Sequence, residues 1–286
     1  MQKSLITVVL FTYFVLTPRV FANSIIFYGS HSGSYQTEIL QHALSYLPEK
    51  HYQIVNFSGQ IPKQRAFDFM NAHQELDVIF GGATINREQQ GLAIRIPLLK
   101  GLNGWRLPLV HKKTPEIFKN INTLAQFKQL VPGQFHSWSD TKVLESNGIR
   151  VEKGSDFEGL FLMLAKQRFD YFPRSILEVF RELNARENLD ITIDNSVLIY
   201  YPTAYYFYVA HDNEQLAQDI TTGLEQAIAD GSFDAIFTKH FSQPIEQISA
   251  IKRKVFFLNN PYLPEKTPLS RKELWLHFPA KSEIIQ

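Results

Sequence analysis

The chain has 286 residues, a net charge of +1 at pH 7 and no cysteine. The lack of cysteine excludes disulfides, a thiol nucleophile and a cysteine-ligated metal site. A charge so close to neutral provides no basic field for nucleic acid or an anionic membrane surface, and the length suits one large domain or two lobes.

The first 22 residues have the pattern of a secretory signal peptide. Lys3 precedes an apolar stretch from Leu5 to Leu16, and the segment ends in the small residue Ala22. This pattern predicts cleavage after Ala22, and the alternative is an uncleaved N-terminal anchor. No cysteine stands at the cleavage point to carry a lipid, so we expect a periplasmic protein without a lipid anchor. Cleavage would remove two cations, Lys3 and Arg19, and change the net charge from +1 to −1.

Strand and helix patterns alternate at the start of the mature chain. Short apolar runs predict strands at 24–28, 52–57 and 76–80. The third run is followed by Gly81-Gly82, which we expect to end it. Helical periodicity between Ile39 and Leu47 predicts a helix that Pro48 stops, and 61–72 predicts a second helix. The β-α-β-α-β order predicts an α/β fold with a parallel sheet covered on both faces.

Two extended passages divide the chain into lobes. Residues 98–105 have little helical period, and 197–209 is rich in tyrosine around Pro202. We interpret both as crossings, by which the chain leaves the first lobe and later returns to it. The predicted boundaries are 23–103 for the first part of lobe one, 104–201 for lobe two and 202–286 for the return to lobe one. The extension beyond Phe241 is expected to wrap lobe one.

Helix-start signals are frequent in the second half. Capping pairs occur at Ser155/Glu158, Ser175/Glu178, Asp212/Gln215 and Ser270/Glu273. The pair at Ser175 predicts a helix through Leu189, and Gly231 is expected to end the helix after Asp212. A further helix is predicted from Ser139 to Asn147. Its N-terminus offers N–H groups and partial positive charge to an anion.

Four segments together resemble the extracellular solute-binding proteins of the polar amino-acid type. The segments are 82–88, 164–171, 204–210 and 230–241. Within that family the chain is most similar to a branch with a Gly-Leu-x-Gly-Trp-Arg crossing, here Gly101 to Arg106. The resemblance implies the two-lobed fold of type II periplasmic binding proteins, with two hinge strands and a ligand cleft that closes by hinge motion.

Two arginines are the leading ligand contacts. The resemblance implies that an arginine between the third strand and the crossing clamps a ligand carboxylate, and Arg87 is nearest in type, although the family's position falls nearer Gln90. The alternative for Arg87 is a solvated helix surface. Arg174 stands where amino-acid binders of that family carry an acid for the ligand's ammonium, which favours an anionic or hydroxyl-bearing ligand. The alternative is that Arg174 lies on the rim and pairs with Glu178.

The remaining candidates lie where the predicted strands and crossings meet the cleft. Ligands of open α/β sheets bind outside the carboxyl ends of the strands. Trp105 and Trp138 are possible aromatic walls, with packing inside a lobe as the alternative. His31 and His136 are possible hydrogen-bonding groups, with simple exposure as the alternative. The other candidates are Arg106, Gln134 and Tyr205.

No catalytic or metal-binding motif stands out in the sequence. Gly29 to Gly33 has His31 where a nucleophile elbow needs serine, and no His-Glu-x-x-His or phosphate-binding glycine loop occurs. We therefore expect a monomeric binding protein with no cofactor and no metal, which captures a small polar or anionic ligand for a membrane transporter. The alternatives are a sensing module for a membrane partner and a periplasmic lyase or dehydratase on the same scaffold.

Overall fold

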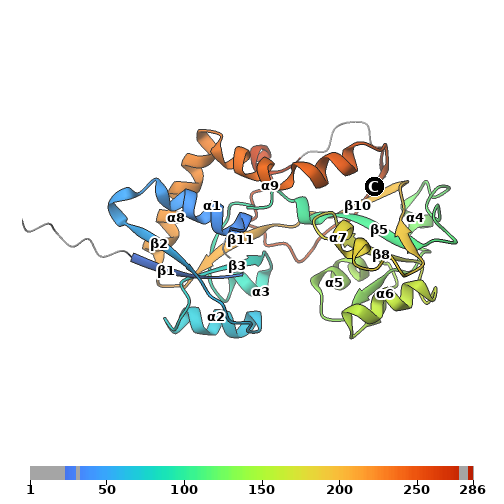
Figure 1. Cartoon of the computed structure of the whole chain (residues 1–286), viewed down its shortest axis with the longest axis horizontal. Helices are drawn as coiled ribbons and strands as arrows, with labels where there is room; N and C mark the ends of the chain where they lie inside the picture. Colours follow the sequence, from blue (N-terminus) through green and yellow to red (C-terminus); the bar gives the residue numbers. More distant parts are fainter. Residues whose placement is uncertain (1–22, 30–32, 277–282, 286) are drawn as a thin grey trace, which may run out of the picture.

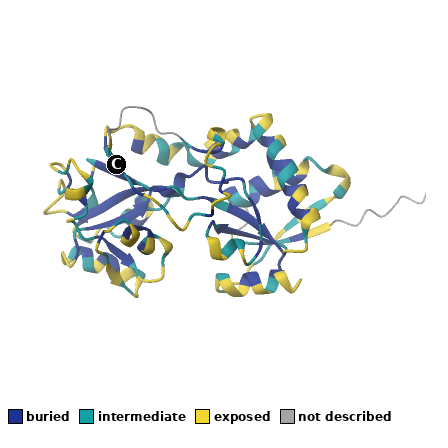
Figure 2. Cartoon of the chain, turned by 180° about the vertical axis from the view of Figure 1, so that it is seen from behind, coloured by how far each residue is buried: buried dark blue, intermediate teal, exposed yellow. Residues whose placement is uncertain are grey.

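The computed structural model describes residues 23–29, 33–276 and 283–285, so the predicted signal peptide lies outside the described residues. Two α/β lobes lie side by side along the long axis of the molecule (Figure 1). Buried strands occupy the centre of each lobe, and the outer faces of the helices are exposed (Figure 2). The α/β architecture predicted from the sequence is therefore confirmed.

The sheet of lobe one has five strands in the order β2-β1-β3-β11-β4. Their bounds are Asn23–Tyr28 (β1), Tyr52–Asn56 (β2), Val78–Gly82 (β3), Leu92–Ile94 (β4) and Tyr205–Val209 (β11). β1 pairs in parallel with β2 and β3, as predicted, while β11 runs antiparallel between β3 and β4. Gly81 and Gly82 do not end the strand. They lie within β3 and pair with Tyr206 and Tyr205. A side chain at Gly82 would crowd Arg87 and Tyr205.

Helices cover both faces of this sheet, with α1 and α8 on one face and α2 on the other (Figure 1). The helical bounds are Tyr35–Ser45 (α1), Pro48–Lys50 (η1), Lys63–Asn71 (α2), Ile85–Glu88 (α3), Glu214–Ala229 (α8) and Ser232–Ser249 (α9). The predicted apolar stripe of α1 is buried from Ile39 to Leu44, although Leu47 lies beyond the helix end. α8 can approach α1 closely because Gly223 has no side chain, and a Cβ there would meet Ala43 O at 1.9 Å.

Lobe two is built on a second sheet in the order β13-β12-β10-β5-β8, with β9 paired to β5. The strand bounds are Trp105–His111 (β5), Tyr171–Ser175 (β8), Ile191–Ile193 (β9), Val197–Tyr200 (β10), Lys254–Phe257 (β12) and Glu283–Ile285 (β13). A separate two-stranded sheet pairs β6, Gly133–Phe135, with β7, Glu152–Gly154. The helices of this lobe are Leu124–Phe127 (α4), Ser139–Ser146 (α5), Phe157–Ala165 (α6) and Val179–Asn184 (α7).

Several helix starts lie one or more residues from the predicted capping pairs. Asp156, not Ser155, caps α6 by accepting from Gly159 N at 2.6 Å, and Asn213, not Asp212, caps α8. Ser175 belongs to β8, so α7 begins only at Val179 and ends before Leu189. The pair at Ser270 precedes a single 3₁₀ turn, Lys272–Leu274 (η3). A cap needs non-helical backbone at the capping residue itself, and the spacing of two residue types does not fix that conformation.

The first crossing turns sharply and is not extended. It contains the 3₁₀ helix Leu102–Gly104 (η2), which begins after Gly101 with a left-handed φ of 72°. A Cβ at Gly101 would lie 2.7 Å from the Trp275 ring, and one at Gly104 would lie 2.2 Å from Tyr201 O. The two glycines therefore allow the first crossing to pack closely against Trp275 and against the backbone of Tyr201.

The C-terminal extension does not simply wrap lobe one. β12 pairs in parallel with β10 of lobe two, and this pairing buries Val255 and Phe256. Residues 258–276, here called the C-terminal strap, then return to the hinge, where Leu276 N donates to Lys100 O at 2.8 Å. The predicted assignment of all of 202–286 to lobe one is therefore wrong for β12 and β13. The backbone of β12 pairs with the edge of β10 that the predicted arrangement left unpaired.

Replacing Gly104 by alanine should destabilise the fold, because its Cβ would have to displace the carbonyl of the neighbouring crossing. We expect Gly104→Ala to lower the free energy of unfolding by about 1–3 kcal/mol, as overpacking does. Gly81→Ala is the matched control, since a Cβ there makes its nearest contact at an ordinary 3.6 Å. Urea denaturation of both variants measures the effect, and equal losses would contradict it.

Candidate functional site

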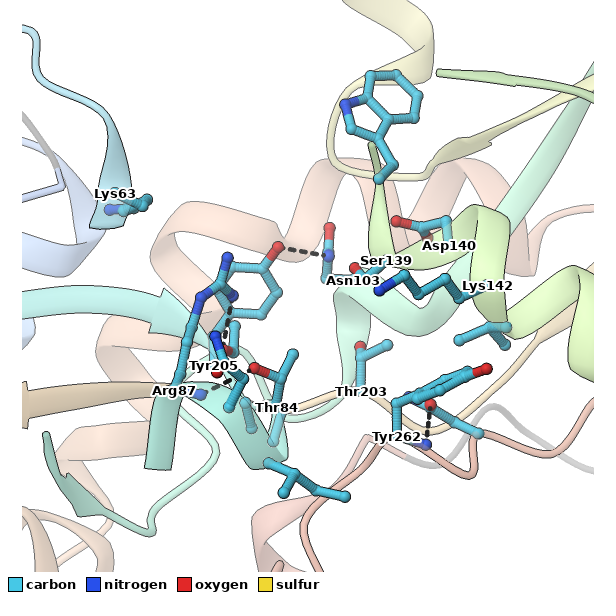
Figure 3. A pocket seen from close by; sticks show the side chains of 18 of the residues that line it. Lys63, Thr84, Arg87, Asn103, Ser139, Asp140, Lys142, Thr203, Tyr205 and Tyr262 are labelled. Carbon is cyan, nitrogen blue, oxygen red and sulfur yellow. Dashed lines mark hydrogen bonds between the residues drawn. The ribbon is translucent and has the colours of Figure 1, made fainter. Parts of the chain in front are cut away.

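A cavity of about 810 Å³ lies between the two lobes (Figure 3). Lobe one lines it with the β3–α3 turn from Gly82 to Arg87 and with Tyr205 of β11. Lobe two lines it with the start of α5 and with the ends of β5 and β8. The C-terminal strap adds Asn260 and Tyr262. The cavity thus adjoins the carboxyl end of β3, the start of β5 and the segment Ser137–Trp138 that leads into α5.

Two cations face the cavity from lobe one. Thr84 caps α3 by accepting from Arg87 N at 3.2 Å, and the Arg87 side chain folds back so that Nη1 donates to Gly82 O at 2.7 Å. Lys63, at the start of α2, donates from Nζ to Phe80 O at 2.7 Å and lies 4.5 Å from the Tyr28 ring centre. Burial and the nearby Arg87 charge lower the pKa of Lys63 to about 8.

Arg106 is buried at the base of the cavity and neutralised there. Only 5% of it is exposed, and its Nη2 donates to Asp140 Oδ1 of α5. The Tyr201 hydroxyl donates to the same carboxylate oxygen. Burial by itself lowers the pKa of Arg106, but the Asp140 carboxylate outweighs it and the pKa lies above its ordinary value. The predicted contact residue Arg106 therefore lines the site already paired with an acid.

Arg174 is held by two acids, Glu178 at the N-cap of α7 and Glu182 within that helix. Its Nε and Nη2 donate to the two carboxylate oxygens of Glu182 at 2.7 and 2.6 Å, and Nη2 also donates to Glu178 at 3.0 Å. The guanidinium carbon lies 4.6 Å from the Trp138 ring centre. Arg174 thus pairs with Glu178, as the alternative reading stated, but it is buried and not on a solvated rim.

Of the three aromatic residues predicted to line the cleft, Trp138 and Tyr205 line the cavity and Trp105 does not. Trp138 lines the cavity, and so does Tyr205, whose hydroxyl accepts from Asn103 Nδ2 at 3.1 Å. Trp105 does not line it and is buried with its ring centre 4.3 Å from that of Tyr200. Successive side chains of a strand point to opposite faces, so Trp105 turns away where Arg106 faces the cavity.

The polar candidates on β6 are not brought to the cavity. Gln134 is buried within lobe two, and His136 is exposed with Nδ1 3.3 Å from Gly154 O. Neither residue lines the cavity. His31 lies outside the described residues. The chain reaches the cavity only after these residues, where Ser137 and Trp138 lead into α5.

Sequence reasoning missed several lining residues. They include Lys63, Asn103, Asp140, Lys142, Thr203 and Tyr262. Lys63 had a usable signal, since it begins the helix that follows a parallel strand, where the same carboxyl-end rule applies. Lys142 is on the predicted helix at 139–147. Tyr262 had no local signal, because only the long-range return of the C-terminal strap places it there.

Comparison with solved structures relates this fold to bacterial solute-binding proteins. An ancestral arginine-binding protein bound to arginine matches with a TM-score of 0.51 and 18% identity, over 76% of this chain and 98% of that one. The probable amino-acid ABC transporter extracellular-binding protein ytmK from Bacillus subtilis matches with a TM-score of 0.55 and 16% identity, over 76% and 97%. The Salmonella typhimurium periplasmic binding protein STM4351, described as highly arginine-specific, matches with a TM-score of 0.50 and 17% identity, over 76% and 99%.

These similarities establish the fold class. The chain has the two-lobed α/β fold of type II periplasmic binding proteins, as the sequence predicted. No family model matches the sequence, and no curated protein does. Across residues 23–29, 33–276 and 283–285, no helix has both the length and the apolar character needed to span a membrane. The same residues contain no group of three or more His, Asp or Glu side chains placed to hold a metal ion.

The low pKa of Lys63 should be directly measurable. In ligand-free protein we expect its Nζ to titrate near pH 8, and Arg87→Gln should raise that pKa because it removes a like charge. The unfolded chain keeps this proton up to about pH 10.5, so the contribution of Lys63 to stability should increase between pH 8 and 10.5. NMR of ¹³C-labelled lysine gives the titration. A pKa near 10.5 would show that Lys63 extends into bulk water.

The two acids on Arg174 should differ in their effect on stability. The Glu182 side chain is 9% exposed and that of Glu178 is 42% exposed. Glu182→Ala should lower the free energy of unfolding by about 3–5 kcal/mol, because it removes the buried partner of a buried charge. Glu178→Ala, the matched control, should change it by less than about 1 kcal/mol. Chemical denaturation compares them, and a larger loss for Glu178→Ala would refute the assignment.

Proposed function

We propose that the protein is a periplasmic solute-binding protein that captures a small polar or anionic ligand between its lobes for a membrane transporter. The observation that carries this proposal is the cavity lined by polar side chains of both lobes at the hinge of a binding-protein fold. Ligand contacts made by both lobes favour the closed state over the open one, and this differential affinity drives closure.

The similar structures support the proposed class without fixing its details. One is described as an arginine-binding protein and another as a probable amino-acid ABC transporter binding protein. For this chain we propose export with cleavage after Ala22 and no lipid anchor. We propose that the mature protein is a monomer and catalyses no reaction. We also propose that Gly101 to Arg106 places it in the branch with that crossing.

Lys63 is the residue of the cavity that bears on the alternative of a lyase. Catalysis would need a titratable group with a displaced pKa facing the cleft, and Lys63 meets that condition. Two acids line the cavity within the described chain, Asp140 and Glu178. Each is paired with an arginine, and neither forms an ion pair with Lys63. This arrangement favours binding over acid–base chemistry.

A thermal-shift screen of the chain from Asn23 tests the function. The panel holds amino acids, dicarboxylates, aromatic acids, small peptides and sugars. A ligand at a hundred times its Kd adds about 2.7 kcal/mol to native stability. We expect a hit that is recovered unaltered from the mixture. A hit that is consumed would replace the proposal by an enzyme, and silence would favour a sensor that needs its membrane partner.

The Arg87→Ala protein should remain folded and lose most of its affinity for the ligand found in that screen. Arg87 makes one side-chain hydrogen bond, to Gly82 O, and no ion pair within the described chain, so its removal leaves no buried charge unpaired. A charge-assisted hydrogen bond to a ligand is worth about 1.5–3 kcal/mol, so affinity should fall at least about tenfold. Calorimetric titration measures it, and unchanged affinity would place Arg87 outside the ligand site.

A further inference from the structure

The charges that line the cavity are strongly unbalanced. Among the described residues that line it, five are cationic and two are acidic. Both acids are already engaged, since Asp140 accepts from Arg106 and Glu178 accepts from Arg174. Each lining carboxylate in the described chain therefore already has a cationic partner, and none is unpaired for the ammonium group of a ligand.

Three cations remain without an acid, and they lie on opposite sides of the cleft. Lys63 and Arg87 belong to lobe one, and Lys142 is on α5 of lobe two (Figure 3). None of the three forms an ion pair with any residue that the structure describes. Closing the lobes without a ligand would bring these like charges together, which is unfavourable. A bound anion would remove that penalty.

Two residues that line the cavity carry buried hydrogen-bond donors without a partner in the described part of the chain. Arg106 is 5% exposed and lines the cavity, and its Nε has no hydrogen-bond partner in the described part of the chain. The buried Thr203 hydroxyl, also of a lining residue, likewise has none there. The first turn of α5 has no side-chain cap, because Trp138 precedes it. N–H and O–H groups of this kind are satisfied by carboxylate oxygens.

We propose that the cleft binds a dicarboxylate without an ammonium group, with one carboxylate held by Lys63 and Arg87 of lobe one and the other by Lys142 and the start of α5 in lobe two. This inference rests on the proposed binding function and narrows its ligand class. A single anionic group would satisfy one lobe only. A ligand with an anionic group at each end bridges both lobes and couples binding to closure.

Isothermal titration of the chain from Asn23 with matched ligands tests the ligand class. The probes are succinate, glutarate and adipate, each compared with its 2-amino derivative and with the monocarboxylate of equal carbon number. We expect at least one dicarboxylate to bind, at least about tenfold more tightly than both of its matched compounds. A tighter 2-amino derivative, or no binding by any of the three dicarboxylates, would overturn the proposal.

The same titrations separate this inference from the proposed function. Arginine and a neutral sugar are included. Binding of either one without any dicarboxylate would overturn the dicarboxylate assignment and leave a solute-binding protein. Silence of every probe would count against both.

A lysine pair tests the bridging geometry. Lys142 and Lys113 are both exposed lysines of lobe two, but only Lys142 lines the cavity. Lys142→Gln should weaken the dicarboxylate at least about tenfold and leave the matched monocarboxylate within about twofold, because lobe one holds that group. Lys113→Gln, which removes the same charge elsewhere, should change neither. Unchanged dicarboxylate affinity in folded Lys142→Gln protein, checked by its melting temperature, would overturn the two-lobe clamp.

Discussion

The close approach of the two crossings at Gly104 is the constraint on which the rest of the molecule depends. Tyr201 N donates to Gly104 O, and the opposing carbonyl leaves no room for a side chain on that glycine. The same contact fixes the start of β5 beside the end of β10, so that Arg106 and Tyr201 reach one carboxylate, Asp140. The hinge thus determines which charges of the cleft are already neutralised, and the packing of two backbones decides the electrostatics of the ligand site.

The C-terminal strap adds a further link between the lobes beside this hinge. On the side of lobe two, Asn259 and Asn147 exchange two hydrogen bonds, of 2.9 and 2.7 Å. At the other end, Leu276 binds the backbone of Lys100, and Trp275 covers Gly101. Arg271 of the strap also pairs with Glu225 of α8 in lobe one, so the strap can follow relative motion of the lobes only between residues 260 and 271. Tyr262, which lines the cavity, lies within this segment, so its position depends on how far the lobes are open.

The sequence predicted what local periodicity controls and missed what distant segments impose. β1, β2, α1 and the helix after Trp138 follow from runs and stripes of apolar residues, and the structure has them. The pairing of β12 with β10 joins residues more than fifty apart, and no local pattern distinguishes it from a strand on lobe one. The site shows the same division. Arg87 was predicted as a ligand contact because the family resemblance implies an arginine between the third strand and the crossing. The Arg174–Glu182 pair lies outside any helical spacing rule, because Arg174 is on a strand.

The buried arginines Arg106 and Arg174 disfavour cationic ligands in the cleft, because they pair with the acids that line it. An ammonium group that enters a cavity without an available carboxylate loses its hydration and gains no partner, and such a group is costly to bury. Arg106 and Arg174 pair with the two acids that line the cavity, Asp140 and Glu178, while Lys63, Arg87 and Lys142 have no acid partner among the described residues. Specificity of this kind comes as much from what the site rejects as from what it binds. The same two arginines that stabilise lobe two therefore also set the sign of the charge that the open cleft can accept.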